Sequence, residues 1–286
     1  MKISLDFGIT ITDCLSSDGK DLKHRAISSK EIPSKNLIKN IFNDIDFKNE
    51  IDLIAVTGGM HGNIGSQLDG IEVVHVNEVQ AVGEGAIKLS NVSKSTTSII
   101  LSAGSGTACI LAKEGEYIHC SGTGVGGGTV LGLSKLLLGT IDPDEIDELA
   151  STGSAKGVDL ILGDVVSGPI GMLPSDTTAV NFGKVSKTEI DFSREDIAAG
   201  IVNLVGQTVA RIATSVAVAY KATDIIVVGR TPTFKSLRNS LEQAALITNF
   251  TPHFPENGHY ASALGALLVA QKYKNPTNLF RLMGFF

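Results

Sequence analysis

Short runs of β-forming residues alternate with helical patterns along the chain, and this alternation restricts the fold more than any other feature. It is typical of α/β proteins rather than all-helical or all-β ones. Strands are predicted at residues 3–7, 54–57, 73–76, 98–103, 107–112 and 225–229. One helix is predicted to follow Asn77. The clearest helix begins at the capping box Ser193-Arg194-Glu195-Asp196 and runs to about Tyr220.

Two segments share the order strand, glycine turn, strand. They are LDFGITIT, from Leu5, and LSAGSGTACI, from Leu101. Their similarity suggests a duplicated lobe, and the 286-residue length allows two compact units. Each turn exposes backbone N–H groups, so two such turns facing across a cleft could hold a polyphosphate. We place the lobe boundary in the polar stretch 90–97.

Composition and charge exclude several classes of protein. The chain has 24 basic and 30 acidic side chains, a net charge of −6 and no cluster of Lys and Arg, which argues against nucleic-acid or anionic-membrane partners. The odd set Cys14, Cys109 and Cys120 argues against a disulfide framework and fits a reducing compartment, so we expect a cytoplasmic protein. Glycine is frequent, with 31 residues gathered in a few turns, which suggests backbone close to a ligand.

Neither export nor membrane insertion is predicted. Asp6 interrupts the apolar run that a signal peptide would need. The most apolar segment, residues 197–219, contains Asn203, Gln207 and Arg211. A buried helix of a soluble protein is therefore the better interpretation.

The turn Asp6-Phe7-Gly8-Ile9-Thr10-Ile11-Thr12 is the first candidate site. A carboxylate beside a glycine turn and two hydroxyls is suited to magnesium-bound phosphate, because hard cations take oxygen ligands. An ordinary hairpin with an Asp-capped turn is the alternative. The turn Ser102-Ala103-Gly104-Ser105-Gly106-Thr107 is a second candidate of the same kind.

The densest glycine run extends from Cys120 to Thr129 and leads into an apolar helix that is expected to stop at Gly139. Unpaired N–H groups at the start of such a helix can bind an anion. The run also satisfies the GxGxxG pattern, with Asp142 at a suitable distance. We reject a dinucleotide site because no second strand leads into Asp142.

Glu78 follows Asn77 at a junction between a strand and a helix. A carboxylate in the first helical turn could accept a proton from a substrate. Helix capping is the simpler explanation. The six histidines show no paired ligand spacing, so a zinc site is not expected.

Taken together, these segments resemble the type II pantothenate kinases, which have the actin, Hsp70 and sugar-kinase fold. The similar segments follow one another in the family's order over nearly the whole chain. They are DFGITIT, VTGG at residues 56–59, NEVQAVGEG at 77–85, SAGSGTA, HCSGTGVGGGTVLGLSKLLLG, NFG at 181–183, VVGR at 227–230 and PENGHYASALGALLVA.

The resemblance implies a two-lobed ATP-dependent kinase with a central nucleotide cleft, usually a homodimer, that phosphorylates pantothenate in coenzyme A biosynthesis. Residues 1–92 would form the N-terminal lobe and residues 93–286 the C-terminal lobe. Glu78 would be the general base, and Asp6 would hold magnesium through water. Further ATP-binding residues would be Gly8, Thr10, Thr12, Gly104, Ser105, Gly106, Thr107, Gly126, Gly127, Gly128, Gly229 and Arg230. The substrate-binding residues would be Ser105, His119, Ser121, Gly122, Thr123 and Tyr260.

Three departures concern the substrate and the phosphates. Ile9 and Asp13 occupy a glycine and a lysine position of the first phosphate loop. His119 replaces an arginine that faces the pantothenate carboxylate or an acyl-CoA feedback ligand, and Ala108 replaces a serine. Three hypotheses therefore stand: a pantothenate kinase, which we favour, a kinase of another hydroxylated metabolite, and a non-catalytic binder of nucleotide or coenzyme A. We also expect the helix at 193–220 at or near a dimer interface, although burial within one chain explains its pattern too.

Overall fold

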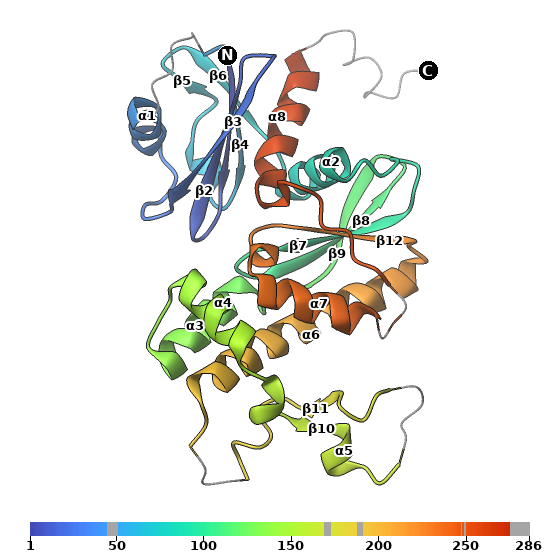
Figure 1. The fold of residues 1–286 in the computed structure, drawn as a ribbon. Coiled ribbons are helices and arrows are strands. Elements are labelled where there is room, and N and C mark those ends of the chain that lie inside the picture. The colour runs from blue at the N-terminus through green and yellow to red at the C-terminus, as the bar shows by residue number, and fades with distance from the viewer. Residues whose placement is uncertain (45–50, 169–172, 188–190, 247, 249, 275–286) are drawn as a thin grey trace. The chain divides into compact units, whose positions relative to one another are not determined.

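The computed structural model describes residues 1–44, 51–168, 173–187, 191–246, 248 and 250–274 (Figure 1). The chain divides into two compact units. The first contains Met1–Thr96, Ile110–His119 and the described part of Pro255–Phe286, and the second contains Thr97–Cys109 and Cys120–Phe254. The first unit thus contains three segments that were predicted to belong to the C-terminal lobe: residues 93–96, 110–119 and the part from residue 255.

A six-stranded sheet forms the centre of the first unit, in the order β3-β2-β1-β4-β6-β5. Strands β1, β4 and β6 run parallel, whereas β2, β3 and β5 are antiparallel to their neighbours. Every residue of β4 is buried, as expected for a central parallel strand. The strands are β1 (Lys2–Phe7), β2 (Ile11–Ser17), β3 (Leu22–Ser28), β4 (Leu53–Gly58), β5 (Gln67–Leu68) and β6 (Ile71–His75).

Alternating side chains of this sheet pack into two separate cores. On one face, Ile3, Leu5 and Val56 pack against Ile38 and Ile41 of helix α1 (Lys35–Asp44). The other face packs against helix α8 (Ala261–Lys274), which follows the 3-10 turn η4 (Gly258–Tyr260). Helix α2 (Glu78–Ser90) packs along α8, and the 3-10 turn η1 (His61–Asn63) follows β4.

The second unit is built on a sheet with the order β12-β7-β8-β9, in which β12 and β7 are parallel. Helices α3, α4 and α7 pack on the long helix α6. Strands β10 and β11 form a small separate pair. The elements are β7 (Ser98–Ala103), β8 (Thr107–Lys113), β9 (Glu116–Thr123), α3 (Gly127–Leu138), α4 (Pro143–Thr152), η2 (Ala155–Gly157), β10 (Leu160–Ile161), α5 (Leu162–Val165), β11 (Thr178–Val180), α6 (Arg194–Tyr220), β12 (Asp224–Val228), η3 (Thr231–Thr233) and α7 (Lys235–Leu246).

Helix α6 begins where the sequence predicts, because the Ser193 hydroxyl accepts a hydrogen bond from the Asp196 N–H at 3.1 Å. It is the one helix of the described residues that is long and apolar enough to cross a membrane, and half of its most apolar window is buried within the structure. The buried half packs against neighbouring helices of its own unit.

All six predicted strands are present, with ends shifted by at most two residues. The predicted helix after Asn77 and the stop at Gly139 are also confirmed. Asp142 caps helix α4 by accepting hydrogen bonds from the N–H groups of Asp144 and Glu145, which gives it a structural role and agrees with rejecting the dinucleotide site.

Candidate active site

The carboxyl ends of the three parallel strands of the first unit place Asp6, Gly58 and Glu78 at the same edge of the sheet. Asp6 lies beside Thr57 in the pairing of β1 with β4. A Cβ atom on Gly58 would come within 2.5 Å of the Asp6 carboxylate oxygen, and Gly58 has a φ of +83°. Glycine is therefore required at this position both by the backbone and by the Asp6 side chain. Ligands of α/β proteins commonly bind at this edge of a parallel sheet.

Glu78 is the first residue of α2, and its side chain is exposed. The cap of this helix is Asn77, whose side-chain oxygen accepts hydrogen bonds from the N–H groups of Val79 at 3.0 Å and Gln80 at 3.3 Å. Capping does not use the Glu78 carboxylate. Asn77 therefore performs the capping that was the simpler explanation of Glu78. The Glu78 carboxylate is available to accept a proton.

Asp13 has a polar partner on the neighbouring strand. Its carboxylate is 2.6 Å from Nε2 of His24 on β3, and its side chain is 7% exposed. Because Asp13 is directly opposite Asp6 in the antiparallel pair, the two side chains lie on the same face of the sheet. The carboxylate that replaces the family's lysine thus has a hydrogen-bonding partner within its own sheet.

Tyr260 lies against the same histidine. The ring centroids of His24 and Tyr260 are 4.8 Å apart, and His259 packs edge-on against both rings. Burial, and to a lesser degree the charge of Glu256, raises the pKa of Tyr260 above its ordinary value. The PENG turn thereby brings a residue expected to bind substrate into the same unit as Asp6 and Glu78.

The two threonines of the first glycine turn lie in different environments. Thr12 is buried, and its hydroxyl is 2.9 Å from the Ser29 hydroxyl. Thr10 is exposed, and its carbonyl accepts a hydrogen bond from the Ser29 N–H. A Cβ on Gly8 would come within 2.5 Å of the Ile11 carbonyl oxygen, so the turn itself requires this glycine. Thr12 therefore has a structural partner, whereas Gly8 and Thr10 lie at an open turn.

In the second unit, the glycine run before α3 binds to the turn between β7 and β8. The N–H of Gly127 donates to the Gly104 carbonyl, and the N–H of Gly128 donates to the Ser105 carbonyl, both at 2.9 Å. The N–H of Gly126 donates to the Thr129 hydroxyl at 3.1 Å. These donors were expected to face an anion. The expectation is corrected, because all three are used within the chain.

The same turn shows which glycines are needed for packing. A Cβ on Gly126 would approach the Ser105 carbonyl oxygen to 2.8 Å, and one on Gly128 would approach it to 2.9 Å. A Cβ on Gly104 would meet nothing closer than 3.7 Å, and one on Gly124 nothing within 4 Å. At Gly104 and Gly124 no part of the chain excludes a larger side chain. A bound ligand close to the backbone can therefore be the reason for glycine at these two positions.

One other predicted ATP-binding segment, around Gly229 and Arg230, reaches this turn. The Thr231 hydroxyl donates to the Gly104 carbonyl at 2.9 Å, and Gly229, with a φ of +99°, lies against the Ala103 backbone. Arg230, between these residues, is partly exposed. The Thr107 hydroxyl instead donates to the Val125 carbonyl at 2.8 Å. Three of the glycine segments recognised in the sequence thus meet at the end of β7.

Strand β9 carries four of the predicted substrate-binding residues. His119 and Gly122 are exposed, whereas Ser121 and Thr123 are partly buried. The alternation of a strand places His119, Ser121 and Thr123 on one face. The Thr123 hydroxyl accepts a hydrogen bond from the Val125 N–H at 3.2 Å.

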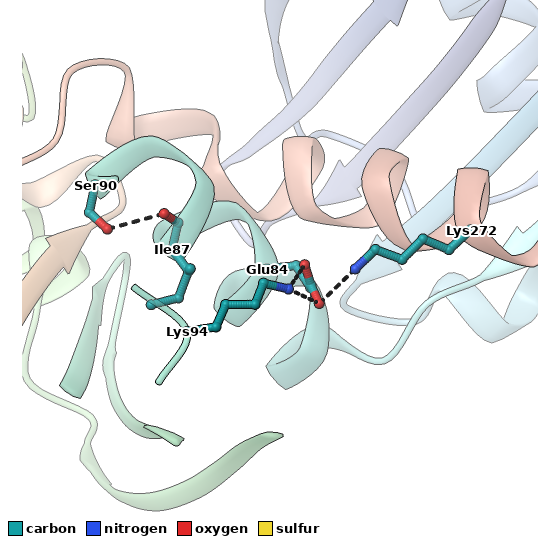
Figure 2. A network of polar contacts seen from close by, with 5 residues as sticks. All are labelled: Glu84, Ile87, Ser90, Lys94 and Lys272. Atoms are coloured by element: carbon teal, nitrogen blue, oxygen red, sulfur yellow. Dashed lines mark hydrogen bonds and ion pairs between the residues drawn. The ribbon is translucent and has the colours of Figure 1, made fainter. Parts of the chain in front are cut away.

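Sequence reasoning missed a charged network on helix α2. Figure 2 shows Glu84 between Lys94 and Lys272, with oxygen–nitrogen distances of 2.8 Å and 2.9 Å. Burial opposes ionisation of Glu84, but the hydrogen bonds and charges of both lysines outweigh it and lower its pKa. Burial and then the charge of Glu84 raise the pKa of Tyr117, whose ring lies where a Cβ of Gly83 would be. The network ties α2, and with it Glu78, to α8.

Asp159 was also missed, and it explains the NFG segment. This fully buried carboxylate accepts hydrogen bonds from Thr178, Asn181, Asn203 and the Phe182 N–H. Phe182 has a φ of +54° that presents its N–H to Asp159. The NFG segment therefore stabilises the structure of the second unit.

Comparison with known proteins identifies the family. The Fumble family model matches residues 16–269. The chain is 32% identical over 229 residues to a type II pantothenate kinase of Bacillus cereus, covering 79% of this chain and 83% of that protein. The chain belongs to the type II pantothenate kinase family. It is also 28% identical to the type II pantothenate kinase of Staphylococcus epidermidis, over 94% of this chain and all of that protein.

Solved structures similar to this type II pantothenate kinase family member show the actin-like ATPase and sugar-kinase fold. The activator of the 2-hydroxyisocaproyl-CoA dehydratase from Clostridium difficile, with bound ADPNP, has a TM-score of 0.66 at 16% identity and covers 98% of this chain and 97% of its own. A ROK family glucokinase from Streptomyces griseus, in complex with glucose and AMPPNP, has a TM-score of 0.58 at 11% identity, with coverages of 95% and 99%. The predicted fold class is confirmed.

Proposed function

We propose that this protein phosphorylates the primary hydroxyl of pantothenate with ATP, the first step of coenzyme A biosynthesis. Membership of the type II pantothenate kinase family supports the substrate and the reaction. The single observation that carries the catalytic assignment is the position of Glu78. It is an exposed carboxylate at the strand edge that also bears Asp6, and Asn77 relieves it of capping.

In the proposed reaction, Glu78 accepts the hydroxyl proton as the pantothenate oxygen attacks the γ-phosphorus of ATP. The new oxygen–phosphorus bond forms while the bond to the bridging oxygen breaks and ADP leaves. Positioning and charge stabilisation supply most of the rate of phosphoryl transfer, and a general base adds about 10²- to 10⁴-fold.

Asp6 fits a role in holding magnesium. Magnesium prefers oxygen ligands, retains several waters and commonly uses one or two carboxylates together with substrate phosphates. Asp6 supplies one such carboxylate, and Gly58 leaves space beside it. When bound with ATP, the ion neutralises phosphate charge. Gly8 and Thr10 in the first unit, and Gly104, Ser105 and Gly106 in the second, are proposed phosphate contacts.

The other predicted site residues fall into three groups: adenosine contacts, pantothenate contacts and residues that support the loops. Gly229 and Arg230 are proposed to border the adenosine. His119, Ser121, Gly122, Thr123 and Tyr260 are proposed to contact pantothenate, with Ser105 at the junction of the two ligands. The other predicted glycines and threonines support these loops through the hydrogen bonds described above: Thr12, Thr107, Gly126, Gly127 and Gly128.

A kinase of another hydroxylated metabolite is the second candidate, favoured by His119 and Ala108 on neighbouring strands β9 and β8. The presence of both Glu78 and Asp6, the carboxylates expected to serve as base and magnesium ligand, argues against a non-catalytic binder. ATP consumption measured over a panel of hydroxylated metabolites tests the choice. Highest kcat/KM for pantothenate supports the proposal, and a better substrate without a carboxylate contradicts it.

We further propose a cytoplasmic homodimer that coenzyme A or an acyl-CoA can inhibit. The apolar residues Val218 and Tyr220 at the end of α6 are 65% and 46% exposed, and they are candidates for the dimer contact. Light scattering at micromolar concentration tests the assembly. A mass near that of the 29.9 kDa chain would contradict the dimer, and twice that mass supports it.

A further inference from the structure

Two histidines of the first unit face each other at the ends of adjacent strands. The Nδ1 atoms of His61 and His75 are 3.1 Å apart, their ring centroids are 5.2 Å apart, and the rings are tilted by 33°. His61 is partly exposed and His75 is exposed, so ions in solution can reach the pair. This arrangement is independent of the proposed kinase reaction.

The backbone fixes both residues. His75 is the last residue of β6 and is paired with Val56 of β4. His61 begins η1, only three residues after β4 ends, and the turn passes through Met60 with a φ of +55°. Ile64, whose N–H donates to the His61 carbonyl, is fully buried in the core and anchors the far end of η1. Neither ligand depends on a long loop.

The distance between the two nitrogens suits a shared metal ion. Zinc–imidazole bonds of about 2.05 Å and a nitrogen–nitrogen distance of 3.1 Å together require an angle of about 98° at the metal. This angle lies between the cis angle of an octahedral or square-planar site and the tetrahedral angle. One metal ion can therefore bond to both nitrogens at their present separation, once each ring turns to aim its Nδ1 lone pair at the ion.

We propose that His61 and His75 form a binding site for a divalent late transition metal of the zinc or copper type. Imidazole nitrogens suit these metals, whereas magnesium prefers oxygen. No group of three or more His, Cys, Asp or Glu side chains that could hold a metal is found in the described part of the chain. The site consequently has two protein ligands, with the remaining positions open to water or another small ligand.

The proposed metal site lies close in sequence to Glu78. Val76 and Asn77 alone separate His75 from Glu78. A bound ion would link η1 to β6 and add positive charge on the strand that leads into α2. Metal binding should also stabilise the folded chain, by an amount that grows with the logarithm of the metal concentration.

Calorimetric titration of the untagged full-length protein with zinc chloride, in 5 mM magnesium chloride at pH 7.5, tests the proposal. One zinc per chain is expected. Loss of a residue that only supports a metal ligand costs about 10- to 100-fold in affinity, so His61→Asn and His75→Asn should each weaken binding by at least about tenfold. The matched control is His253→Asn, an exposed histidine of the second unit, which should leave the affinity unchanged.

Copper supplies a second measurement on the unmodified protein. The electron paramagnetic resonance spectrum of copper(II) bound to the wild-type protein should show hyperfine coupling to two imidazole nitrogens. This coupling tests the two-histidine site even if either variant fails to fold. The proposal would be overturned by the absence of zinc binding at 100 µM, by wild-type zinc affinity in both asparagine variants, or by a copper spectrum without coupling to two nitrogens.

Discussion

The contact between α2 and α8 makes Gly265→Ala a sensitive test of the first unit. A Cβ on Gly265 would lie 1.7 Å from the Ala81 carbonyl oxygen and 2.7 Å from the Gly85 nitrogen. Cβ atoms do not approach other heavy atoms closer than 3.0 Å, so the helices must separate by about 1.3 Å. The obstructing atoms belong to the backbone and cannot rotate away. This separation would also loosen the core around Ala266 and Val269.

Overpacking of a core costs about 1–3 kcal/mol, and the rigid obstruction places Gly265→Ala at the upper end. Replacing glycine by alanine within a helix returns about 0.5–1 kcal/mol. The expected net loss is about 2 kcal/mol, which corresponds to a fall in Tm of roughly 4–8 °C. Thermal unfolding followed by circular dichroism measures it.

Gly132→Ala is the matched control. Gly132 lies in the interior of helix α3, and a Cβ there meets nothing within 4 Å. The same chemical change should therefore stabilise the protein by about 0.5–1 kcal/mol. A Gly265→Ala protein with a Tm equal to or above that of the wild type would refute the close helix contact.

Four further substitutions separate structural from ligand-binding roles. Glu84→Gln should lower stability by about 1–2 kcal/mol at pH 7, because charged hydrogen bonds are lost but both lysines can be solvated. Since the folded pKa of Glu84 lies below its ordinary value of 4.5, the difference should begin to fade once pH falls below 4.5 and should be lost as pH falls through the lower folded pKa. A loss that is constant from pH 7 to pH 3 would contradict the ion pair. Gly104→Ala should raise the KM for ATP with little change in Tm, whereas Gly126→Ala should lower Tm; the reverse pattern would contradict the packing argument. His119→Arg should lower the KM for pantothenate about tenfold and leave the KM for ATP unchanged, because arginine can bind a carboxylate through two charged hydrogen bonds; an unaltered KM would point to a substrate with no carboxylate there.

The sequence predicts the local elements well where strong patterns act within a few residues. Apolar runs mark β4 and β7, and the side chains of Asn77 and Ser193 cap helices at the expected positions. These signals are local, because a cap or a buried strand is specified by its own side chains.

The glycine run before α3 shows where such reasoning stops. A pattern of glycines indicates close approach of the backbone to something, but not whether the neighbour is a ligand or another part of the chain. At Gly126 and Gly128 the neighbour is the turn at Ser105, from a segment about 20 residues earlier. Only the folded structure distinguishes these positions from Gly104 and Gly124.

Long-range pairing explains the other omissions. His61 and His75 are separated by 14 residues, a spacing that matches no metal-binding motif, yet adjacent strand ends bring them together. Asp13 looks like an isolated charge reversal until β3 supplies His24. Glu84 likewise acquires Lys272 from α8, which the sequence analysis placed in the other lobe.

The most direct test of the central claim is phosphoryl transfer by Glu78→Gln. The purified wild-type and variant proteins are incubated with ATP, magnesium and pantothenate, and phosphopantothenate is quantified by mass spectrometry while nucleotide binding is measured by calorimetry. The account predicts product from the wild type, a loss of about 10²- to 10⁴-fold in kcat for the variant, and unchanged ATP affinity, because only the proton acceptor is altered. Turnover by Glu78→Gln close to that of the wild type would contradict the assignment of Glu78 as the general base, and absence of phosphopantothenate with the wild type would contradict the proposed reaction itself.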